Sequence, residues 1–395
     1  MKTVGILGGG QLGAMLAERL LARGARVRVF DPDPRAPGIV RCAGDATIAP
    51  WNDDAALARF ARGCDALTCE FESVPASAAE VAARHAPLVP DARVLAIAQH
   101  RVREKEFLRK EGFPHARFAA VGRAEALLGA AEALGYPLVV KTASGGYDGK
   151  GQRTVTMPAE LAEFARDARR AGFGDVGFVL EERVDLALEI SCIVARSAAG
   201  DEVVFPAFEN LHRDHALDFS VVPARVAPAV ADAAQRIAIA VARALGVVGL
   251  LAVEFFVART APRGDRVETI DGAHLLVNEI APRPHNSGHV TRVACRMDQF
   301  DALARVLLGV PLEQPVPLHT GAFCMGNLFG EHWRDGAPPP ALAAAQQGGS
   351  LREVVLYGKD EARPRRKMGH FSVHAATGDA ALAAARALRD GEPAR

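Results

Sequence analysis

The 395-residue chain carries 47 basic and 47 acidic residues, and its formal net charge of zero argues against a nucleic acid as the main partner. A hydrophobic content of 49% with 24% charged residues is typical of a soluble globular protein of about two to four domains, and no apolar run is long enough to span a membrane. The six cysteines are scattered without a C-x-x-C pair, which indicates a reduced, cytoplasmic chain without a structural zinc.

Strand and helix patterns alternate in residues 1–100, which predicts an N-terminal doubly wound, Rossmann-like domain with a parallel sheet. Glu70-Phe71-Glu72 closes the third strand of this domain. Because open parallel sheets bind ligands at the carboxyl ends of their strands, we expect at least one of these acids to face a substrate. The expected strands are residues 4–7, 26–30 and 66–69, and the expected helices are residues 11–21 and 52–62.

The turn after the first strand is rich in glycine, and Asp31 ends the next strand. This spacing matches the dinucleotide-binding fingerprint. Glycines are also needed where a strand packs closely on a helix, and a helix N-terminus can bind other phosphorylated ligands. NAD binding therefore stays open, but a structural turn or another phosphorylated ligand is favoured. The turn reads Gly8-Gly9-Gly10-Gln11-Leu12-Gly13.

Residues 101–310 are expected to form a second, larger domain that contains a small α+β lid at about residues 137–181. A charged helical pattern fills residues 101–111 and precedes the lid. The long alanine-rich helix at residues 228–244 follows it. Other expected strands are residues 116–119, 138–140, 154–156 and 177–181, and other expected helices are residues 123–134 and a segment that begins at Pro158.

A glycine-rich loop follows the strand that ends near Lys141. Its backbone amides can close over a polyphosphate, and Lys141 and Lys150 supply positive charge. The loop lacks the G-x-x-x-x-G-K-[ST] pattern and is not a P-loop. A plain hairpin turn is the alternative, although it requires fewer glycines. The loop reads Gly145-Gly146-Tyr147-Asp148-Gly149-Lys150-Gly151-Gln152.

A second acidic segment, Glu181-Glu182-Arg183-Val184, leaves the last strand of the lid, and Glu189 follows it. The backbone of a strand exit can bind the edge of an adenine, and a carboxylate can accept hydrogen bonds from ribose hydroxyls. A solvated acidic turn is the alternative interpretation of the segment. Its position after the lid favours nucleotide binding.

Ionisable groups are densest at the end of another apolar strand. Glu254 lies in a second apolar run, and pairing of the two strands would bring it near Glu279. Two such carboxylates with Asn278 suit two magnesium ions that bridge a triphosphate, and Arg283 could stabilise a phosphoryl group in transfer. A structural cluster of salt bridges is the alternative. The segment reads Asn278-Glu279-Ile280-Ala281-Pro282-Arg283-Pro284-His285-Asn286-Ser287-Gly288-His289.

The last part of the chain, residues 318–395, is expected to form a small sheet domain with a helix at residues 379–388, after a linker at residues 311–317. Its basic run suits a phosphate monoester, and a solvated basic face is the alternative. Only seven of the 47 basic residues of the chain are lysines, and two of these lie in the run. It contains Lys359, Arg363, Arg365, Arg366, Lys367 and His370.

The order of these motifs resembles the ATP-grasp superfamily: a strand lysine, a glycine lid loop, hinge acids, then paired metal carboxylates. Within it, the chain is similar to the N5-carboxyaminoimidazole ribonucleotide synthases of purine biosynthesis. The resemblance covers nearly the whole chain and is most specific at Pro284-His285-Asn286-Ser287-Gly288-His289. It also includes Glu209-Asn210-Leu211-His212 and Arg366-Lys367-Met368-Gly369-His370. It implies an α/β ATP-grasp fold with the N-terminal domain, the lid, a central α+β domain and the small C-terminal sheet domain.

The resemblance also implies a role for each motif residue. It places Arg283, His285, Asn286 and Lys150 in catalysis, and Glu254 and Glu279 on magnesium. The aminoimidazole ribonucleotide would contact Gln11, Leu12, Glu70 and Tyr147, and its 5′-phosphate would contact Lys359, Arg366 and Lys367. ATP would contact Arg101, Lys141, Gly146, Tyr147, Asp148, Gly149, Lys150, Gly151, Gln152, Glu181, Glu182, Arg183, Val184, Glu189, His212, Asn278 and Glu279.

The implied reaction is the ATP-dependent carboxylation of 5-aminoimidazole ribonucleotide by bicarbonate, through carboxyphosphate, in a cytoplasmic homodimer. A formate-dependent glycinamide ribonucleotide transformylase, or another ATP-grasp ligase, is the nearest alternative. A nicotinamide oxidoreductase leaves Glu254, Glu279 and the lid loop without a role. A regulator without catalytic activity would be expected to lack the metal carboxylates. Glu182 and Arg183 are more charged than expected beside an adenine, so the adenine contacts are less well defined than the magnesium ligands.

Overall fold

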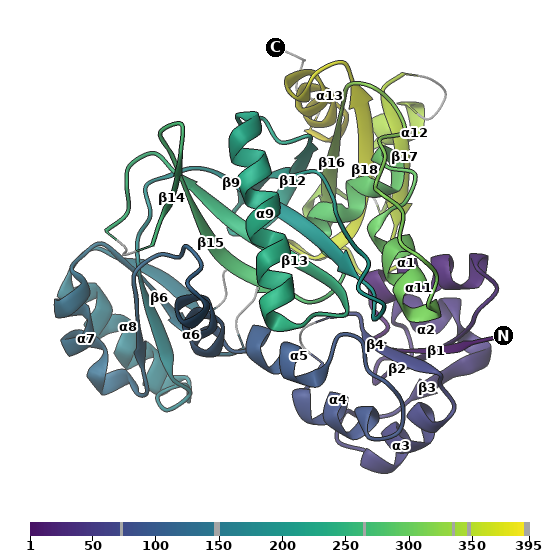
Figure 1. Ribbon diagram of the computed structural model, residues 1–395, viewed down its shortest axis with the longest axis horizontal. Coiled ribbons are helices and arrows are strands. Elements are labelled where there is room, and N and C mark those ends of the chain that lie inside the picture. Colours follow the sequence, from purple (N-terminus) through teal and green to yellow (C-terminus); the bar gives the residue numbers. More distant parts are fainter. Residues whose placement is uncertain (72–73, 146–150, 264–265, 334–335, 346–348, 391–395) are drawn as a thin grey trace.

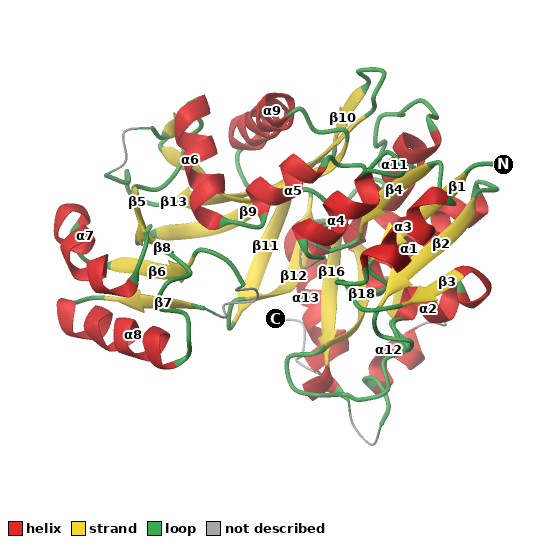
Figure 2. Ribbon diagram, turned by 90° about the horizontal axis from the view of Figure 1, so that it is seen from below, coloured by secondary structure: helices red, strands yellow, loops and turns green. Residues whose placement is uncertain are grey.

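The computed structural model describes residues 1–71, 74–145, 151–263, 266–333, 336–345 and 349–390. Three sheets organise this part of the chain, and the lid and the N-terminal sheet lie at opposite ends of the molecule (Figures 1 and 2). No helix among the described residues is both long enough and apolar enough to cross a membrane.

The N-terminal sheet is parallel, with strand order β3-β2-β1-β4, as the alternating pattern predicted. Helix α3 begins where the side chain of Asp53 accepts a hydrogen bond from the backbone N–H of Ala56 at 2.9 Å. The strands are β1 (Thr3–Leu7), β2 (Arg26–Asp31), β3 (Ala46–Ile48) and β4 (Ala66–Cys69). The helices are α1 (Gln11–Ala22), α2 (Pro37–Arg41), α3 (Asp54–Arg62), α4 (Ala76–Ala83) and α5 (Ala92–Ala98).

The lid is an antiparallel four-stranded sheet with strand order β5-β8-β6-β7, and α7 and α8 lie side by side at its outer end (Figures 1 and 2). It starts earlier than residue 137, because the first strand of the sheet is β5. The buried faces of both helices pack on the sheet in one apolar cluster. The elements are β5 (Phe118–Val121), α7 (Leu127–Leu134), β6 (Leu138–Thr142), β7 (Gln152–Val155), α8 (Pro158–Arg170) and β8 (Phe178–Glu182).

The central sheet is antiparallel and has the order β14-β15-β13-β9-β11-β12-β16-β18-β17, with β10 paired to β9. Helix α9 (Pro228–Leu245) begins with a proline and ends at Gly246, which adopts the left-handed conformation with φ 68°. Its small buried residues pack on the sheet. The strands are β9 (Leu186–Arg196), β10 (Glu202–Val204), β11 (Phe208–Arg213), β12 (Ala216–Val222), β13 (Gly249–Ala258), β14 (Glu268–Ile270) and β15 (Ala273–Ala281).

The C-terminal strands do not form a sheet of their own, in contrast to the expected separate sheet. β16 pairs with β12, so β16, β18 and β17 extend the central sheet. The expected C-terminal helix is α13, which packs against β16 and β18, and residues 311–317 contain no helix or strand. The elements are β16 (Ala322–Phe329), α12 (Pro340–Ala345), β17 (Leu351–Leu356), β18 (Lys367–Ala375) and α13 (Gly378–Asp390).

Candidate active site

A cleft of about 1420 Å³ is lined by residues of the lid, the central sheet and the N-terminal domain. This volume exceeds that of a typical small-molecule pocket and suits more than one ligand. Most of the site residues expected from the sequence line it. They are Gln11, Leu12, Glu70, Arg101, Lys141, Gln152, Glu181, Glu182, Arg183, Val184, Glu189, His212, Glu254, Asn278, Glu279, Arg283, His285, Asn286 and Lys367.

Some expected residues are not in this lining. Gly146, Tyr147, Asp148, Gly149 and Lys150 lie outside the described residues, as does Glu72. Gly151 is described but is not among the lining residues. Lys359 and Arg366 are likewise absent from the lining, although they lie close to Lys367, which belongs to it.

The two acidic strands pair as expected and bring Glu254 opposite Glu279 in the register of β13 and β15. Burial opposes ionisation of Glu254, but the charge and hydrogen bond of His285 outweigh burial and hold its pKa at about 2. The side chain of Glu279 is open to the cleft. Surrounding protein atoms and the Glu254 charge raise the pKa of Glu279. A bound cation relieves the electrostatic repulsion between two facing carboxylates of this kind.

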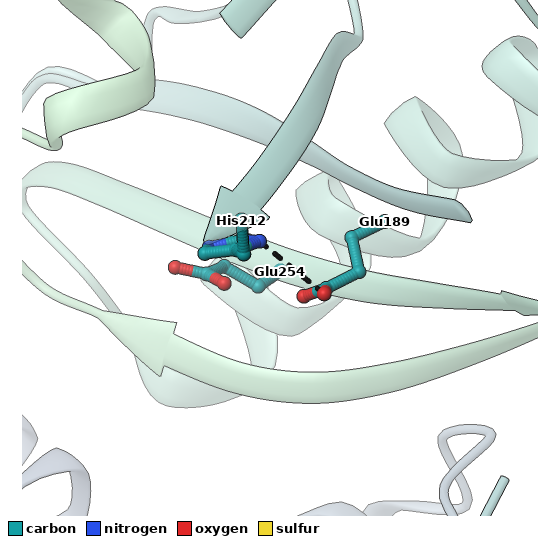
Figure 3. A group of neighbouring side chains, drawn as sticks. All are labelled: Glu189, His212 and Glu254. Atoms are coloured by element: carbon teal, nitrogen blue, oxygen red, sulfur yellow. Dashed lines mark ion pairs between the residues drawn. The ribbon is translucent and has the colours of Figure 1, made fainter. Parts of the chain in front are cut away.

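Glu254 also belongs to a group with Glu189 on β9 and His212 on β11, and possible ligand atoms of the three residues lie within 4.8 Å of one another (Figure 3). His212 Nδ1 lies 3.2 Å from Glu189 Oε1. Burial opposes protonation of His212, but its hydrogen bond to Glu189 and the charges of the nearby carboxylates together outweigh burial and raise its pKa. These three residues therefore bring two carboxylates and an imidazole together at one point of the cleft.

Lysines from two elements meet the lid carboxylate Glu181. Lys141 Nζ lies 2.9 Å from one oxygen of Glu181, and Lys105 Nζ lies 3.4 Å from the other. Burial opposes ionisation of Glu181, but the two lysine charges outweigh burial and hold its pKa at about 2. Lys105 Nζ also donates to the carbonyl of Asn278 at 2.7 Å. Lys105 thus joins the lid strand β8 to the strand β15 that carries Glu279.

Glu182, the last residue of β8, is buried, and only one of its two carboxylate oxygens has a hydrogen-bond partner among the described residues. Its Oε1 accepts from the backbone N–H of Arg263 at 2.8 Å. Its Oε2 has no hydrogen-bond partner among the described residues. A buried acceptor of this kind is costly unless a ligand or water donates to it. Arg183 and Val184 follow it along the edge of the cleft.

The segment after β15 lines the cleft beside the facing carboxylates. His285 Nε2 lies 2.8 Å from Glu254 Oε1. Neither amide atom of Asn286, both of which are buried, has a hydrogen-bond partner within the described chain. The Arg283 guanidinium lies 5.5 Å from the centre of the Phe71 ring. Arginine and amide groups arranged in this way can hold a small oxyanion.

The glycine-rich turn before α1 is occupied by carboxylates of the protein itself. Gly10 N donates to Glu70 Oε1 at 3.0 Å, Gly13 N donates to Glu70 Oε2 at 2.7 Å, and Gly9 N donates to Asp31 Oδ2 at 2.7 Å. A Cβ on Gly10 would lie 2.3 Å from Glu70 Oε1. The glycines therefore admit the Glu70 side chain, and their amides are not free for a dinucleotide phosphate. Burial raises the pKa of Glu70 to about 7.

The C-terminal lysines and arginine form a basic group beside Glu70. Lys359 Nζ donates to the Lys367 carbonyl at 2.8 Å. Burial and the charges of Arg366 and Lys367 together lower the pKa of Lys359 to about 8, and Glu70 partly opposes them. An anion bound between these cations would relieve their repulsion.

Models of three protein families match successive parts of the chain. A ribonucleotide synthetase preATP-grasp domain matches residues 1–99, an ATP-grasp domain residues 106–300, and a phosphoribosylaminoimidazole carboxylase C-terminal domain residues 324–384. The N5-carboxyaminoimidazole ribonucleotide synthase of Brucella melitensis is 38% identical over 94% of this chain and 95% of its own length. The chain belongs to the N5-carboxyaminoimidazole ribonucleotide synthase family.

Solved structures of this synthase family have the same fold. An ADP complex of one synthetase aligns with a TM-score of 0.84 at 35% identity, covering 98% of this chain and 96% of the other. The Aspergillus clavatus synthase, in complex with ADP and 5-aminoimidazole ribonucleotide, aligns with a TM-score of 0.84 at 27% identity, covering 99% of both chains. The expected ATP-grasp fold is confirmed, and the nicotinamide oxidoreductase interpretation is not supported.

Two buried residues of α6 (Arg101–Glu111) belong to the site of this synthase-family chain but were missed in the sequence. Glu104 Oε1 accepts from the backbone N–H of Ile280 at 2.6 Å, and Lys105 is the cation described above. Both flank Glu279 through contacts to the backbone of its neighbours, Ile280 and Asn278. A signal was present, because Arg101, Glu104, Lys105 and Leu108 have the i, i+3, i+4, i+7 spacing of one helix face.

Replacing Glu104 with glutamine is expected to stabilise the protein increasingly as pH rises. Burial raises the pKa of Glu104 from its ordinary value of 4.5 to about 8. The stability that the protonated carboxyl contributes is therefore complete below pH 4.5 and is lost as pH rises through 8. Glutamine keeps an acceptor for Ile280 N without acquiring charge. Thermal unfolding should show an advantage on the order of 3 kcal/mol above pH 8 that vanishes below 4.5.

The matched control is Glu106→Gln, which removes an exposed carboxylate from the same helix. Its unfolding temperature is expected to follow that of the wild type within the small range usual for surface changes. If the stability of Glu104→Gln and that of the wild type depend on pH in the same way, Glu104 is not a buried titrating acid.

Proposed function

We propose that this protein catalyses the ATP-dependent carboxylation of 5-aminoimidazole ribonucleotide by bicarbonate in purine biosynthesis. The observation that carries the proposal is the 2.8 Å contact between His285 Nε2 and Glu254 Oε1. It brings the segment after β15 beside the facing carboxylates within one cleft, which supports the proposal. The full-length similarity to curated synthases and to the complex with ADP and the ribonucleotide supports the same assignment.

ATP would lie between the lid and the central sheet. Lys141 and Arg101 line this end and would meet its phosphates, while Glu181, Glu182, Arg183, Val184, Glu189 and His212 would surround the nucleoside. The residues Gly146–Lys150 and Gln152 of the lid loop belong to the same proposal. Lys150 would add a positive charge over the transferred group.

Glu254 and Glu279 fit a pair of magnesium ions, because their facing carboxylates supply the hard oxygen ligands that the ion prefers. Asn278 Oδ1 is a further acceptor without a hydrogen-bond partner among the described residues. Bound magnesium would neutralise charge on the β- and γ-phosphates. Burial and the charge of Glu254 raise the pKa of Glu279, and a bound cation would oppose both effects.

The ribonucleotide would lie at the other end of the cleft. Its 5′-phosphate would be bound by Lys359, Arg366 and Lys367, and its base would lie near Gln11, Leu12, Tyr147 and Glu70. With a pKa of about 7, Glu70 can take up a proton near neutral pH. That property suits a group beside the reacting amine.

Bicarbonate would be held by Arg283, His285 and Asn286. One of its oxygens attacks the γ-phosphorus of ATP, the bond to the β–γ bridging oxygen breaks, and ADP leaves with carboxyphosphate formed. The exocyclic amine then attacks the carboxyl carbon, or carbon dioxide released from it, and inorganic phosphate leaves as the amine loses a proton. The protein positions the reactants and stabilises the developing charge.

The test is ADP release by purified protein with ATP and magnesium. Release is expected to require both 5-aminoimidazole ribonucleotide and bicarbonate, and the carboxylated product should appear in equal amount. Release that depends instead on formate and glycinamide ribonucleotide would replace this proposal with the transformylase. Magnesium dependence is checked by chelation and by adding the ion back.

A cytoplasmic location and a homodimer belong to the same proposal and rest on the family resemblance. The sedimentation behaviour of the purified protein tests the dimer directly. A monomer at all concentrations would overturn that part alone.

A further inference from the structure

The β11–β12 hairpin turns at Asp214 and His215, and both residues have a left-handed backbone, with φ angles of 49° and 65°. Arg213 pairs with Ala216, so the turn has two residues, and a type I′ turn requires positive φ at both of them. Aspartate tolerates this conformation better than most residues, but glycine is the usual residue at the second position. A histidine there is kept at a cost to the backbone, which directs attention to the contact that its side chain makes.

The ring of His215 contacts the lid. Gln152 Nε2 lies 3.2 Å from His215 Nδ1, and because an amide nitrogen can only donate a hydrogen bond, the ring nitrogen accepts it. Gln152 is the first residue of β7, and both side chains line the cleft. His215 was not among the site residues expected from the sequence. The hydrogen bond therefore joins the lid sheet to the central sheet across the cleft.

Gln152 has a defined place in the lid. It pairs with Lys141 in the antiparallel register of β6 and β7, so the two side chains lie on the same face of the lid sheet. Just before it, Thr142 N donates to the Gly151 carbonyl at 2.8 Å and joins the two strands. A contact made by the Gln152 side chain thus acts on the lid strands next to the lysine that would meet the phosphates.

The tip of the hairpin is held from the other side by the C-terminal part of the chain. The guanidinium of Arg365 donates to the Asp214 carbonyl, and Arg365 N donates to Glu331 Oε2 at 2.7 Å. The register of β11 and β12 shifts between Leu211 and His212, and an irregularity of this kind bends the strand. The turn is therefore fixed on the C-terminal side, and its second residue faces the lid.

We propose that His215 is a positioning residue for the lid: its ring binds the Gln152 side chain and thereby holds β6 and β7 over the nucleotide. This inference rests on the proposed function for the place of the nucleotide, between the lid and the central sheet. A lid that is already held in place loses less freedom when the nucleotide binds, so the contact raises nucleotide affinity. The unfavourable backbone conformation of His215 is retained because the ring is needed at the tip.

The first test is His215→Gly, with the affinity for magnesium-ADP measured by titration calorimetry in the absence of the other substrates. Glycine removes the ring but suits the positive φ, so the unfolding temperature of the ligand-free protein should be no lower than that of the wild type. The dissociation constant for ADP is expected to rise about fivefold, as loss of one hydrogen bond implies. An unchanged dissociation constant would overturn the proposal, and a lower unfolding temperature would show that the ring is structural.

His215→Asn provides the rescue. Asparagine tolerates a left-handed backbone, and its Oδ1 stands as many bonds from the backbone as His215 Nδ1, so it can accept from Gln152 Nε2. The dissociation constant of this variant should stay within about twofold of the wild-type value. A loss equal to that of His215→Gly would overturn the role of the hydrogen bond.

The matched control is Asp271→Gly in the turn between β14 and β15. It changes another exposed residue with a positive φ, 50°, outside the cleft lining. The backbone effect of the substitution is therefore the same in kind, but no contact with the lid is lost. ADP binding should be unchanged, and a rise like that of His215→Gly would attribute the effect to the backbone and overturn the proposal.

A double substitution separates a positioning role from direct contact with the nucleotide. Gln152→Ala removes the partner of His215 in the lid. If His215 acts through Gln152, adding His215→Gly to Gln152→Ala should cause no further loss of ADP affinity. A further loss of about fivefold in that background would show that His215 touches the nucleotide itself, and the positioning role would be wrong.

Turnover provides a further readout. His215→Gly is expected to raise the KM for ATP about fivefold, with the KM values for the ribonucleotide and bicarbonate unchanged. An equal rise in all of these KM values would indicate general distortion of the cleft and would overturn the positioning role. If no substrate pair supports turnover while ADP binding behaves as expected, the proposed reaction fails and the role of His215 stands. If carboxylation proceeds while His215→Gly binds ADP as the wild type does, the role of His215 fails alone.

Discussion

Replacing Glu279 with glutamine is expected to lower ADP release at least a hundredfold. The carboxylate faces Glu254 across the β13–β15 pair and would share the magnesium ions that neutralise the triphosphate. Loss of one metal-bound charge removes several kcal/mol of transition-state stabilisation, and about 2.7 kcal/mol already corresponds to a hundredfold change in rate. The measurement is steady-state ADP release at saturating ATP, magnesium, bicarbonate and ribonucleotide.

The same substitution is expected to leave the fold intact. The pKa of Glu279 is raised by surrounding protein and by Glu254, so its ionisation destabilises the ligand-free protein as pH rises above the ordinary value of 4.5. Glutamine removes that repulsion. The unfolding temperature near neutral pH should therefore equal or exceed that of the wild type. Residues retained for ligand binding often lower the stability of a protein in this way.

The matched control is Glu268→Gln on β14, the strand next to β15, where the carboxylate is exposed. It should retain wild-type turnover and stability. Residual activity above about a tenth in Glu279→Gln would contradict the magnesium role, because a lost metal ligand costs far more than that. Loss of activity together with a large fall in unfolding temperature would instead indicate a structural role.

The facing carboxylates could be predicted because Glu254 lies within a long apolar run and Glu279 directly follows a short one, so both runs indicate buried strands. If residues 250–257 form one strand and the strand at residues 275–277 continues to Glu279, successive side chains of each strand point to opposite faces of the sheet. The two strands then need a particular register to bring Glu254 opposite Glu279. A shift of one residue would turn one carboxylate to the opposite face. The register shift after Glu254 lies next to this pair, and no local pattern in the sequence indicates it.

A chain of hydrogen-bonded, buried polar side chains behind His285 could not be predicted in this way. Ser191, Asn210 and Ser287 come from β9, β11 and the segment after β15, and they meet only because the central sheet orders these strands side by side. Serine and asparagine are common on surfaces, so their burial is a property of the assembled sheet. The pairing of β16 with β12 could not be predicted for the same reason, because it joins residues about a hundred positions apart in the sequence.

The second large effect is expected on stability, from replacing Glu181 with alanine. Lys105 has a side-chain exposure of only 2%, and Glu181 is its carboxylate partner at 3.4 Å. Breaking a buried pair by removing one partner costs about 3–5 kcal/mol, because the remaining charge stays buried without compensation. Thermal unfolding should show a loss of about 3 kcal/mol near neutral pH.

The pH dependence of this loss has a defined sign. The lysine charges hold the pKa of Glu181 at about 2, so its contribution is present above its ordinary value of 4.5 and is lost as pH falls toward 2. The difference between wild type and Glu181→Ala should narrow over that window. The control is Glu163→Ala on α8, whose exposed carboxylate lies 4.0 Å from Arg153 and should contribute less than about 1 kcal/mol.

A double substitution separates the buried charge from other causes. If Lys105 destabilises Glu181→Ala because it is left buried and unneutralised, then adding Lys105→Met should recover most of the lost stability, since an apolar side chain of similar length needs no counter-charge. The Asn278 carbonyl would lose its donor at 2.7 Å, which limits the recovery. If the double variant instead loses as much stability as the two single variants combined, the buried charge of Lys105 is not the cause of the loss. Lys141 would then be the principal partner of Glu181.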